Sequence, residues 1–259
     1  MKKLLCLVCA FTLLLSGCGS KNDEAKIRVF ADSSLTTALN EIVEDYNKEN
    51  PVNIEIVSGG TGSLCNRIED GAQCDIFIPA SKEQINSLIQ DEYLQEKNVT
   101  PILKNNMVLI KNYNNDTTVK SFDTVPEAST IAMAKESEPV GSFAREIFIN
   151  LNVFKQVLTM KTNECDDSPS VAQNIADNKS DVGVCFETDA LAYADKIQII
   201  TLAPSDSLNS QVLYSVAVLN TDDGTDPNDN IKDFATYLDS PEAAEVFTNH
   251  DFDVYIEDN

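Results

Sequence analysis

The feature that most constrains the fold is a repeated order of short apolar segment, small polar residues and amphipathic helix. The segments Ile27–Ala31 and Val52–Val57 read as strands, and each is followed by Ser, Thr or Gly residues and a helical pattern. A third apolar segment, Cys74–Ile78, comes after the second of these helices. Strands that alternate with helices form parallel sheets with ligand sites at the carboxyl ends of the strands. The sequence therefore predicts an α/β fold.

This order of elements also places four helix starts at which an anion could bind. They follow or contain Ser34, Thr61 in the glycine-rich loop 58–63, Val140 and Ser168. Free backbone N–H groups and the helix dipole can hold an anion there without any cationic side chain. Each start alone is equally consistent with an ordinary capped helix. Two such starts in each half of the chain favour an oxyanion site in a cleft that closes between two lobes.

The chain of 259 residues suits two lobes better than one. We expect residues 27–105 and 216–259 to form lobe 1 and residues 106–215 to form lobe 2. Each lobe is predicted to hold a mixed, mostly parallel sheet flanked by helices, with the ligand in the cleft between the lobes.

The N-terminus has the pattern of an export signal. A basic start, Met1–Lys3, precedes the apolar stretch Leu4–Leu15 and then Ser16, Gly17 and Cys18. This order matches a bacterial lipoprotein signal, and an ordinary signal peptide or a short membrane anchor is the alternative. We expect residues 1–17 to be removed, Cys18 to carry lipid and residues 18–26 to act as a tether. The chain would then be anchored to the outer face of the cell membrane, or on its periplasmic side.

Charge and residue types exclude several functions. The formal net charge of −23 leaves no basic surface for nucleic acid. The single histidine, His250, argues against a Cys/His metal site, and no base stands beside a nucleophile, so we expect neither a bound metal cation nor enzymatic catalysis.

Four cysteines remain after the signal and the lipid site, at positions 65, 74, 165 and 185. They allow three pairings, of which Cys65 with Cys74 and Cys165 with Cys185 close the shortest loops.

Five motifs together resemble those of the molybdate-binding component of bacterial ABC importers, a two-lobed extracytoplasmic solute-binding protein of type II. The resemblance covers nearly all of residues 27–255. It rests on VFADSSLT at 29–36, SGGTGSL at 58–64 with Arg67-Ile68-Glu69, AQCDIFI at 72–78, EPVGSFARE at 138–146 and GVCF at 183–186 with Thr188-Asp189-Ala190.

The resemblance implies that molybdate or tungstate is held by neutral hydroxyl and backbone N–H donors, with no cofactor. The implied donors are the hydroxyls of Ser34 and Thr61, the backbone N–H of Val140, and a group at Ser168 or Val171. It also implies an ABC importer permease as partner, and we expect the chain itself to be a monomer.

The sequence departs from the family pattern at several positions. Phe186 stands where the family has a tyrosine, and a lost bond to a charged ligand costs about 1.5–3 kcal/mol unless Thr188, Tyr214 or water replaces it. Asp32 stands where the family usually has alanine, and Asp166 and Asp167 precede Ser168. These acids are compatible with ordinary helix starts, but near the ligand they would repel a dianion. The same fold binding another oxyanion or a small carboxylate therefore stays open, as does a non-binding structural surface lipoprotein.

Overall fold

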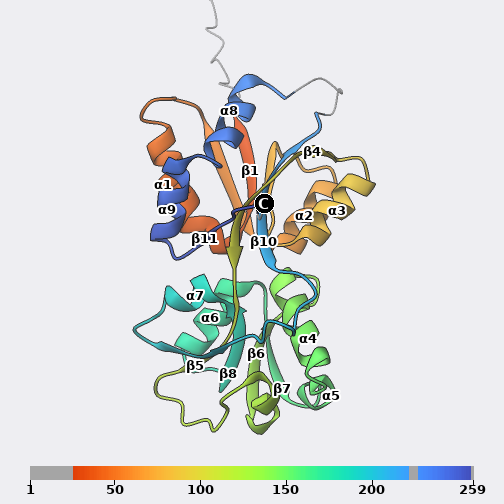
Figure 1. Ribbon diagram of the computed structural model, residues 1–259, viewed down its shortest axis with the longest axis vertical. Coiled ribbons are helices and arrows are strands. Elements are labelled where there is room, and N and C mark those ends of the chain that lie inside the picture. Colours follow the sequence, from red (N-terminus) through yellow and green to blue (C-terminus); the bar gives the residue numbers. More distant parts are fainter. Residues whose placement is uncertain (1–25, 222–226, 258–259) are drawn as a thin grey trace, which may run out of the picture.

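The computed structural model describes residues 26–221 and 227–257, which form two lobes stacked along the long axis of the molecule (Figure 1). The predicted signal at 1–17 and the lipid site Cys18 lie outside the described residues. Within the described part of the chain, every helix is too short or too polar to cross a bilayer.

Lobe 1 is built on a six-stranded sheet with helices on both faces (Figure 1). The strand order is β11-β4-β10-β3-β1-β2, in which β1 pairs in parallel with β2 and β3, while β10 and β11 pair antiparallel with their neighbours. Its elements are β1 (Ile27–Asp32), the 3₁₀ turn η1 (Ser33–Leu35), α1 (Thr36–Tyr46), β2 (Ile54–Gly59), α2 (Thr61–Glu69), β3 (Ile76–Ile78), α3 (Lys82–Gln90), β4 (Leu94–Asn105), β10 (Val212–Leu219), α8 (Asp229–Tyr237), α9 (Pro241–Asn249) and β11 (Asp253–Val254).

Lobe 2 contains a five-stranded sheet in the order β7-β6-β8-β5-β9. Here β6 pairs in parallel with β7 and β8, and β5 pairs antiparallel with β8 and β9. Its elements are β5 (Met107–Asn112), the 3₁₀ turn η2 (Phe122–Glu127), β6 (Thr130–Ala134), α4 (Pro139–Asn150), α5 (Phe154–Val157), β7 (Lys161–Cys165), α6 (Ser168–Ala176), β8 (Val182–Phe186), α7 (Glu187–Leu191) and β9 (Ile197–Leu202).

The two sheets confirm the expected mixed α/β lobes, although antiparallel pairs are as prominent as parallel ones. The chain passes between the lobes twice, after β4 and before β10. The returning strand β10 is antiparallel to both β3 and β4. The predicted return boundary at residue 216 needs correction. β10 pairs with β4 from Val212 onward, so residues 212–215 belong to the sheet of lobe 1.

The helices form because their apolar residues recur on one face and find a sheet to cover. In α1, for example, Ala38, Leu39, Ile42 and Tyr46 are buried while the intervening positions are polar. A large apolar cluster runs through both lobes, and a second one packs α2 and α3 against the sheet of lobe 1. This packing fixes the helix starts relative to the strand ends.

The four cysteines of the described chain are buried free thiols, so neither of the short-loop pairings exists here. Burial raises the pKa of Cys65 and Cys74 to about 12 and that of Cys165 to about 11, and it raises the pKa of Cys185 well above its ordinary range. These thiols are therefore protonated at neutral pH and behave as small apolar side chains.

Candidate functional site

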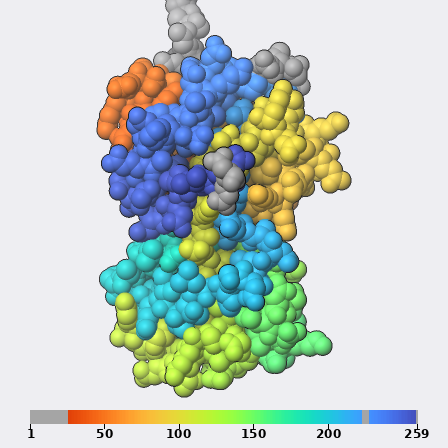
Figure 2. Space-filling view, in the orientation of Figure 1, coloured from red at the N-terminus to blue at the C-terminus, as the bar shows by residue number. Residues whose placement is uncertain are grey.

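The lobes meet where the carboxyl ends of β1 and β2 face the helix starts of lobe 2, and Figure 2 shows them in contact across the waist. The contact is close at the glycine-rich loop. A Cβ atom added at Gly62 would lie only 2.9 Å from the carbonyl carbon of Ser137 in lobe 2. A Cβ atom at Gly60 would collide with the carboxylate of Glu138. Glycine at position 62 therefore lets the two backbones approach, and glycine at position 60 leaves room for the Glu138 side chain.

Asp32 is the centre of the hydrogen bonds on the lobe 1 side. Asp32 ends β1, its side chain caps η1, and the residue is 4% exposed. One carboxylate oxygen, Oδ1, accepts from the backbone N–H of Ser34 at 3.2 Å and from the Ser34 hydroxyl at 2.7 Å. The other, Oδ2, accepts from the Thr61 hydroxyl at 2.6 Å. The two predicted hydroxyl donors thus converge, and they converge on a carboxylate of the chain itself.

Glu138 supplies a second carboxylate, and it reaches across from lobe 2. It precedes α4, is 4% exposed, and accepts from the backbone N–H groups of Gly62 at 2.8 Å and Ser63 at 3.0 Å. These N–H groups lie in the first turn of α2, where they lack acceptors within the helix. The first N–H groups after the glycine-rich loop are therefore occupied by a carboxyl group of the chain itself, the side chain of Glu138.

The two donors expected from lobe 2 lie at the starts of α4 and α6. Val140 is the second residue of α4, where a backbone N–H has no acceptor within the helix. Ser168 is the first residue of α6, and its hydroxyl accepts from the backbone N–H of Phe186 at 2.9 Å. The N–H of Val171, the alternative to Ser168, already donates to the carbonyl of Asp167 at 3.2 Å. The Ser168 hydroxyl also has a hydrogen bond with Asp189, so both candidate groups already have partners within lobe 2.

Phe186 ends β8 with its ring buried, and the ring of Tyr214 stands edge-on to it with centroids 6.1 Å apart. The Tyr214 hydroxyl lies 2.9 Å from the Ser34 hydroxyl and accepts from the Asn105 side chain at 3.2 Å. A tyrosine hydroxyl is therefore present in this site after all, but it comes from β10. Asn105 also donates to the Thr188 hydroxyl at 3.0 Å.

Buried carboxyl groups dominate the electrostatics. Burial raises the pKa of Asp32, although hydrogen bonds from Thr61 and Ser34 oppose the rise. Burial also raises the pKa of Glu138, against the effect of its two backbone donors. Asp189 of α7 is the extreme case, because burial raises its pKa to about 8 and a hydrogen bond from Ser168 offsets only part of the change. Its second oxygen, Oδ2, has no hydrogen-bond partner among the described residues.

Asp166 and Asp167, which the sequence placed beside the site, have different roles. Asp167 caps α6 by accepting from the backbone N–H of Ser170 at 2.9 Å, and its charge raises the pKa of Asp32 and Glu138. Asp166 points outward to Lys135 at 2.5 Å. Sequence reasoning missed Glu138 and Asp189 as members of the site. The available signal was the series of acids at successive helix starts, of which only Asp32, Asp166 and Asp167 were singled out.

A groove of about 600 Å³ leads to this cluster between η1, α7 and the end of α9. Its lining includes Ser33, Ser34, Thr188, Asp189 and His250. His250, which ends α9, pairs with Glu41 at 2.8 Å and has no nucleophile as a partner among its described contacts. The groove therefore connects Ser34 and Asp189 with the surface.

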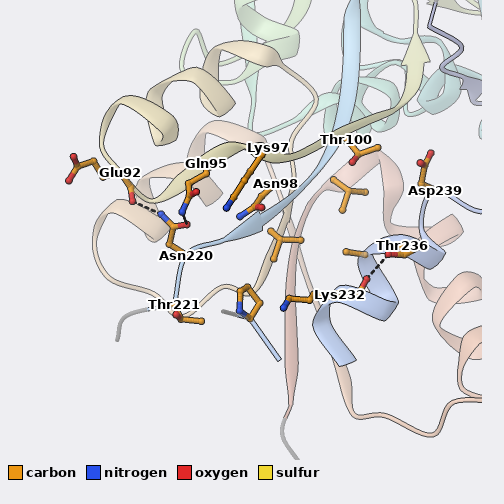
Figure 3. A pocket seen from close by; sticks show the side chains of 14 residues that line it. Glu92, Gln95, Lys97, Asn98, Thr100, Asn220, Thr221, Lys232, Thr236 and Asp239 are labelled. Carbon is orange, nitrogen blue, oxygen red and sulfur yellow. Dashed lines mark hydrogen bonds between the residues drawn. The ribbon is translucent and has the colours of Figure 1, made fainter. Parts of the chain in front are cut away.

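Another cavity, of about 660 Å³, lies on lobe 1 between β4, β10 and α8 (Figure 3). None of the described residues in the hydrogen-bond network around Asp32 and Glu138 lines this cavity. Its walls carry both positively and negatively charged side chains. Lys97 and Lys232 line the cavity, as do Glu92 and Asp239. In Figure 3, Asn220 bridges Gln95 and the backbone of Glu92, which fills part of the wall with internal hydrogen bonds.

Comparison with known proteins agrees with this architecture. The family model described as bacterial extracellular solute-binding protein matches residues 27–253. YvgL of Bacillus subtilis, provisionally named an ABC transporter substrate-binding lipoprotein, is 30% identical over 93% of both chains. The molybdate-binding protein ModA of Haemophilus influenzae is 29% identical over 93% of this chain and 95% of its own.

A solved substrate-binding domain from Clostridium difficile, provisionally assigned to a molybdenum ABC transporter, superposes with a TM-score of 0.67 and 27% identity over 90% of this chain and 99% of that one. The family model spans both lobes and every residue of the interlobe network. The chain belongs to the bacterial extracellular solute-binding proteins.

Proposed function

We propose that the chain is the receptor of an ABC importer, and that it captures a tetrahedral oxyanion of the molybdate and tungstate class between its lobes. The observation that carries the proposal is the convergence of Ser34, Thr61 and the first turn of α2 on anionic groups. All of these donors are neutral, which is the chemistry that holds an oxyanion without a counter-ion. Relatives named for molybdate binding, with comparable length, support the choice of ligand.

Calorimetric titration and thermal shift of the body from residue 27 onward test the proposal. Molybdate, tungstate, sulfate and inorganic phosphate are compared at equal ionic strength. A ligand at a hundred times its Kd stabilises the folded protein by about 2.7 kcal/mol, which is readily measured. Binding of molybdate or tungstate supports the proposal. Absence of heat and of thermal shift with both metal oxyanions refutes it.

A second candidate keeps the fold and changes the ligand to another oxyanion or a small carboxylate. Two carboxylates, those of Asp32 and Glu138, already accept hydrogen bonds from these donors. The donors are therefore suited to a carboxylate group. The same titration distinguishes the candidates, because phosphate or a small carboxylate would then bind in preference to molybdate.

We further propose that lipid on Cys18 holds a monomeric receptor at the outer face of the membrane, where it meets the permease. The sequence around Cys18 supports this, and the lipoprotein name of YvgL is consistent with it. Mass spectrometry of the membrane fraction should show a diacylglyceryl group on Cys18, and Cys18→Ala should release the protein. A soluble wild-type chain without lipid would contradict the anchor.

A further inference from the structure

The hydroxyl hydrogens that Thr61 and Ser34 could offer to a ligand can be counted one by one. The Thr61 hydroxyl has a single hydrogen, which it donates to Asp32, while its oxygen accepts from the backbone N–H of Ala80 at 3.1 Å. The Ser34 hydroxyl likewise gives its single hydrogen to Asp32. Neither hydroxyl can donate to an oxyanion while Asp32 keeps these bonds.

The direction of the neighbouring hydrogen bonds follows from that count. Because the Ser34 hydroxyl donates to Asp32, the Tyr214 hydroxyl must be the donor in its 2.9 Å contact with Ser34. Tyr214 in turn accepts from the Asn105 side chain. The chain of donors from Asn105 through Tyr214 and Ser34 thus ends on Asp32, which is its acceptor.

The groups that face Asp32 add no compensating positive charge. They are Asp167 before α6, Glu138 before α4, Asp189 in α7 and Tyr214 in β10. Lys135 interacts electrostatically with Glu138, but it is exposed and forms an ion pair with Asp166. None of the ion pairs found between described residues includes Asp32, Glu138, Asp167 or Asp189. An oxyanion that enters beside an ionised Asp32 therefore meets like charge.

A proton on Asp32 resolves both difficulties. The neutral carboxyl group no longer requires two hydroxyl donors, and it gains an O–H that can itself donate to the oxyanion. Burial already favours this neutral form, since it raises the pKa of Asp32. The charge repulsion is also relieved when the ligand brings the proton, because an oxyanion with an O–H group can donate it to the carboxylate.

Building on the proposed function, we propose that Asp32 determines the specificity of the site by making the oxyanion bind together with one proton. The site then takes oxyanions that carry an O–H group at neutral pH without further cost. Oxyanions that are fully deprotonated, such as molybdate, tungstate and sulfate, require a proton from solvent.

Calorimetry of the folded body in pairs of buffers with different ionisation enthalpies measures the protons taken up per anion bound. At pH 8 we expect close to one proton for molybdate and close to none for inorganic phosphate, which is there mainly hydrogen phosphate. The molybdate Kd should rise about tenfold per pH unit between pH 7 and pH 8.5, as linkage to one proton requires.

Asp32→Asn supplies amide hydrogens in place of the carboxylate, so it should bind molybdate without proton uptake and with a flat pH profile. Asp166→Asn is the matched control, since Asp166 is an acid of the same region that faces outward to Lys135. It should keep the wild-type proton count.

The outcomes separate the two proposals. Molybdate binding with no proton uptake by the wild-type chain overturns the role of Asp32 and leaves the receptor function standing. Proton uptake that persists in folded Asp32→Asn also overturns it, because another carboxyl group would then be responsible. If neither the wild type nor Asp32→Asn binds any of the four anions from pH 5.5 to pH 8.5, both proposals fail. The wild-type proton count does not depend on whether the variant folds.

Discussion

Substituting Gly62 with alanine should separate the lobes without weakening the helix that carries the change. Gly62 lies in the first turn of α2, where alanine improves helix propensity by about 1 kcal/mol. Its new Cβ would overlap the carbonyl group of Ser137, with the carbonyl carbon only 2.9 Å away. Both partners are backbone, so the lobes must move apart and the bonds from Gly62 and Ser63 to Glu138 must lengthen or break.

The size of the effect follows from those two bonds. Hydrogen bonds to a charged group contribute about 1.5–3 kcal/mol each, so loss of both makes closure less favourable by about 3–6 kcal/mol. The ratio of closed to open molecules would then fall by a factor of about a hundred to twenty thousand. We expect a larger radius of gyration in small-angle X-ray scattering and a weaker affinity for the bound anion.

Gly59→Ala is the matched control for this experiment. Its Cβ would meet the Leu64 side chain of the same lobe at 3.4 Å, which is an ordinary contact. This variant should scatter and bind as the wild type does. If Gly62→Ala also keeps the wild-type scattering curve and affinity, the lobes do not close through the contact described here.

Three further substitutions test the buried polar groups. Asp189 has its pKa raised from 3.8 to about 8, so its contribution to stability is fully present below pH 4 and is lost as the pH rises to about 8. In urea unfolding, Asp189→Asn should flatten that fall and gain up to about 4 kcal/mol over the wild type at pH 7, whereas parallel curves would contradict it. Thr61→Val removes the hydroxyl that donates to Asp32 and accepts from Ala80, so it should lower the free energy of unfolding by about 2–4 kcal/mol. Thr61→Ser keeps the hydroxyl and should stay near the wild type. Equal losses in the two variants would argue against these bonds. Phe186→Tyr should raise molybdate affinity about tenfold in calorimetry through one added hydroxyl donor, and an unchanged Kd would show that the Tyr214 hydroxyl already fills this role.

Elements with a clear apolar pattern could be predicted from the sequence. The strands β1, β2 and β3 begin and end within two residues of the apolar segments that predict them, because each carries a compact apolar run. The sequence does not identify the strand β4. It contains Pro101, and its first half is largely exposed, so neither alternation nor an apolar run identifies it. The edge strand β7 is also largely exposed, and the sequence does not identify it for the same reason.

For the hydrogen bonds of the candidate site, the sequence predicts the donor groups but not the groups that accept from them. The sequence places Ser34, Thr61 and Ser168 where strands end and helices begin, since these are local features. It does not show that the side chain of Glu138, which precedes α4, accepts from the N–H of Gly62 in α2, 76 positions away in the chain. That contact depends on how the lobes meet, and no local pattern encodes it. Asp32 was recognised as a potential obstacle to a dianion, but its position between the two hydroxyls needed the structure.

The position of β10 in lobe 1 bears on the order in which the chain acquires its structure. This strand lies between β4 and β3, yet it follows all of lobe 2 in the sequence. The strands of lobe 2 come from one uninterrupted stretch, Met107–Leu202, and can pair as soon as that stretch is available. Lobe 1 must wait for its central strand, and contacts that span so much chain form slowly. Pulse-labelled hydrogen exchange during refolding should therefore protect β5, β6 and β8 before β3, and a chain emerging from export would present a finished lobe 2 on an incomplete lobe 1.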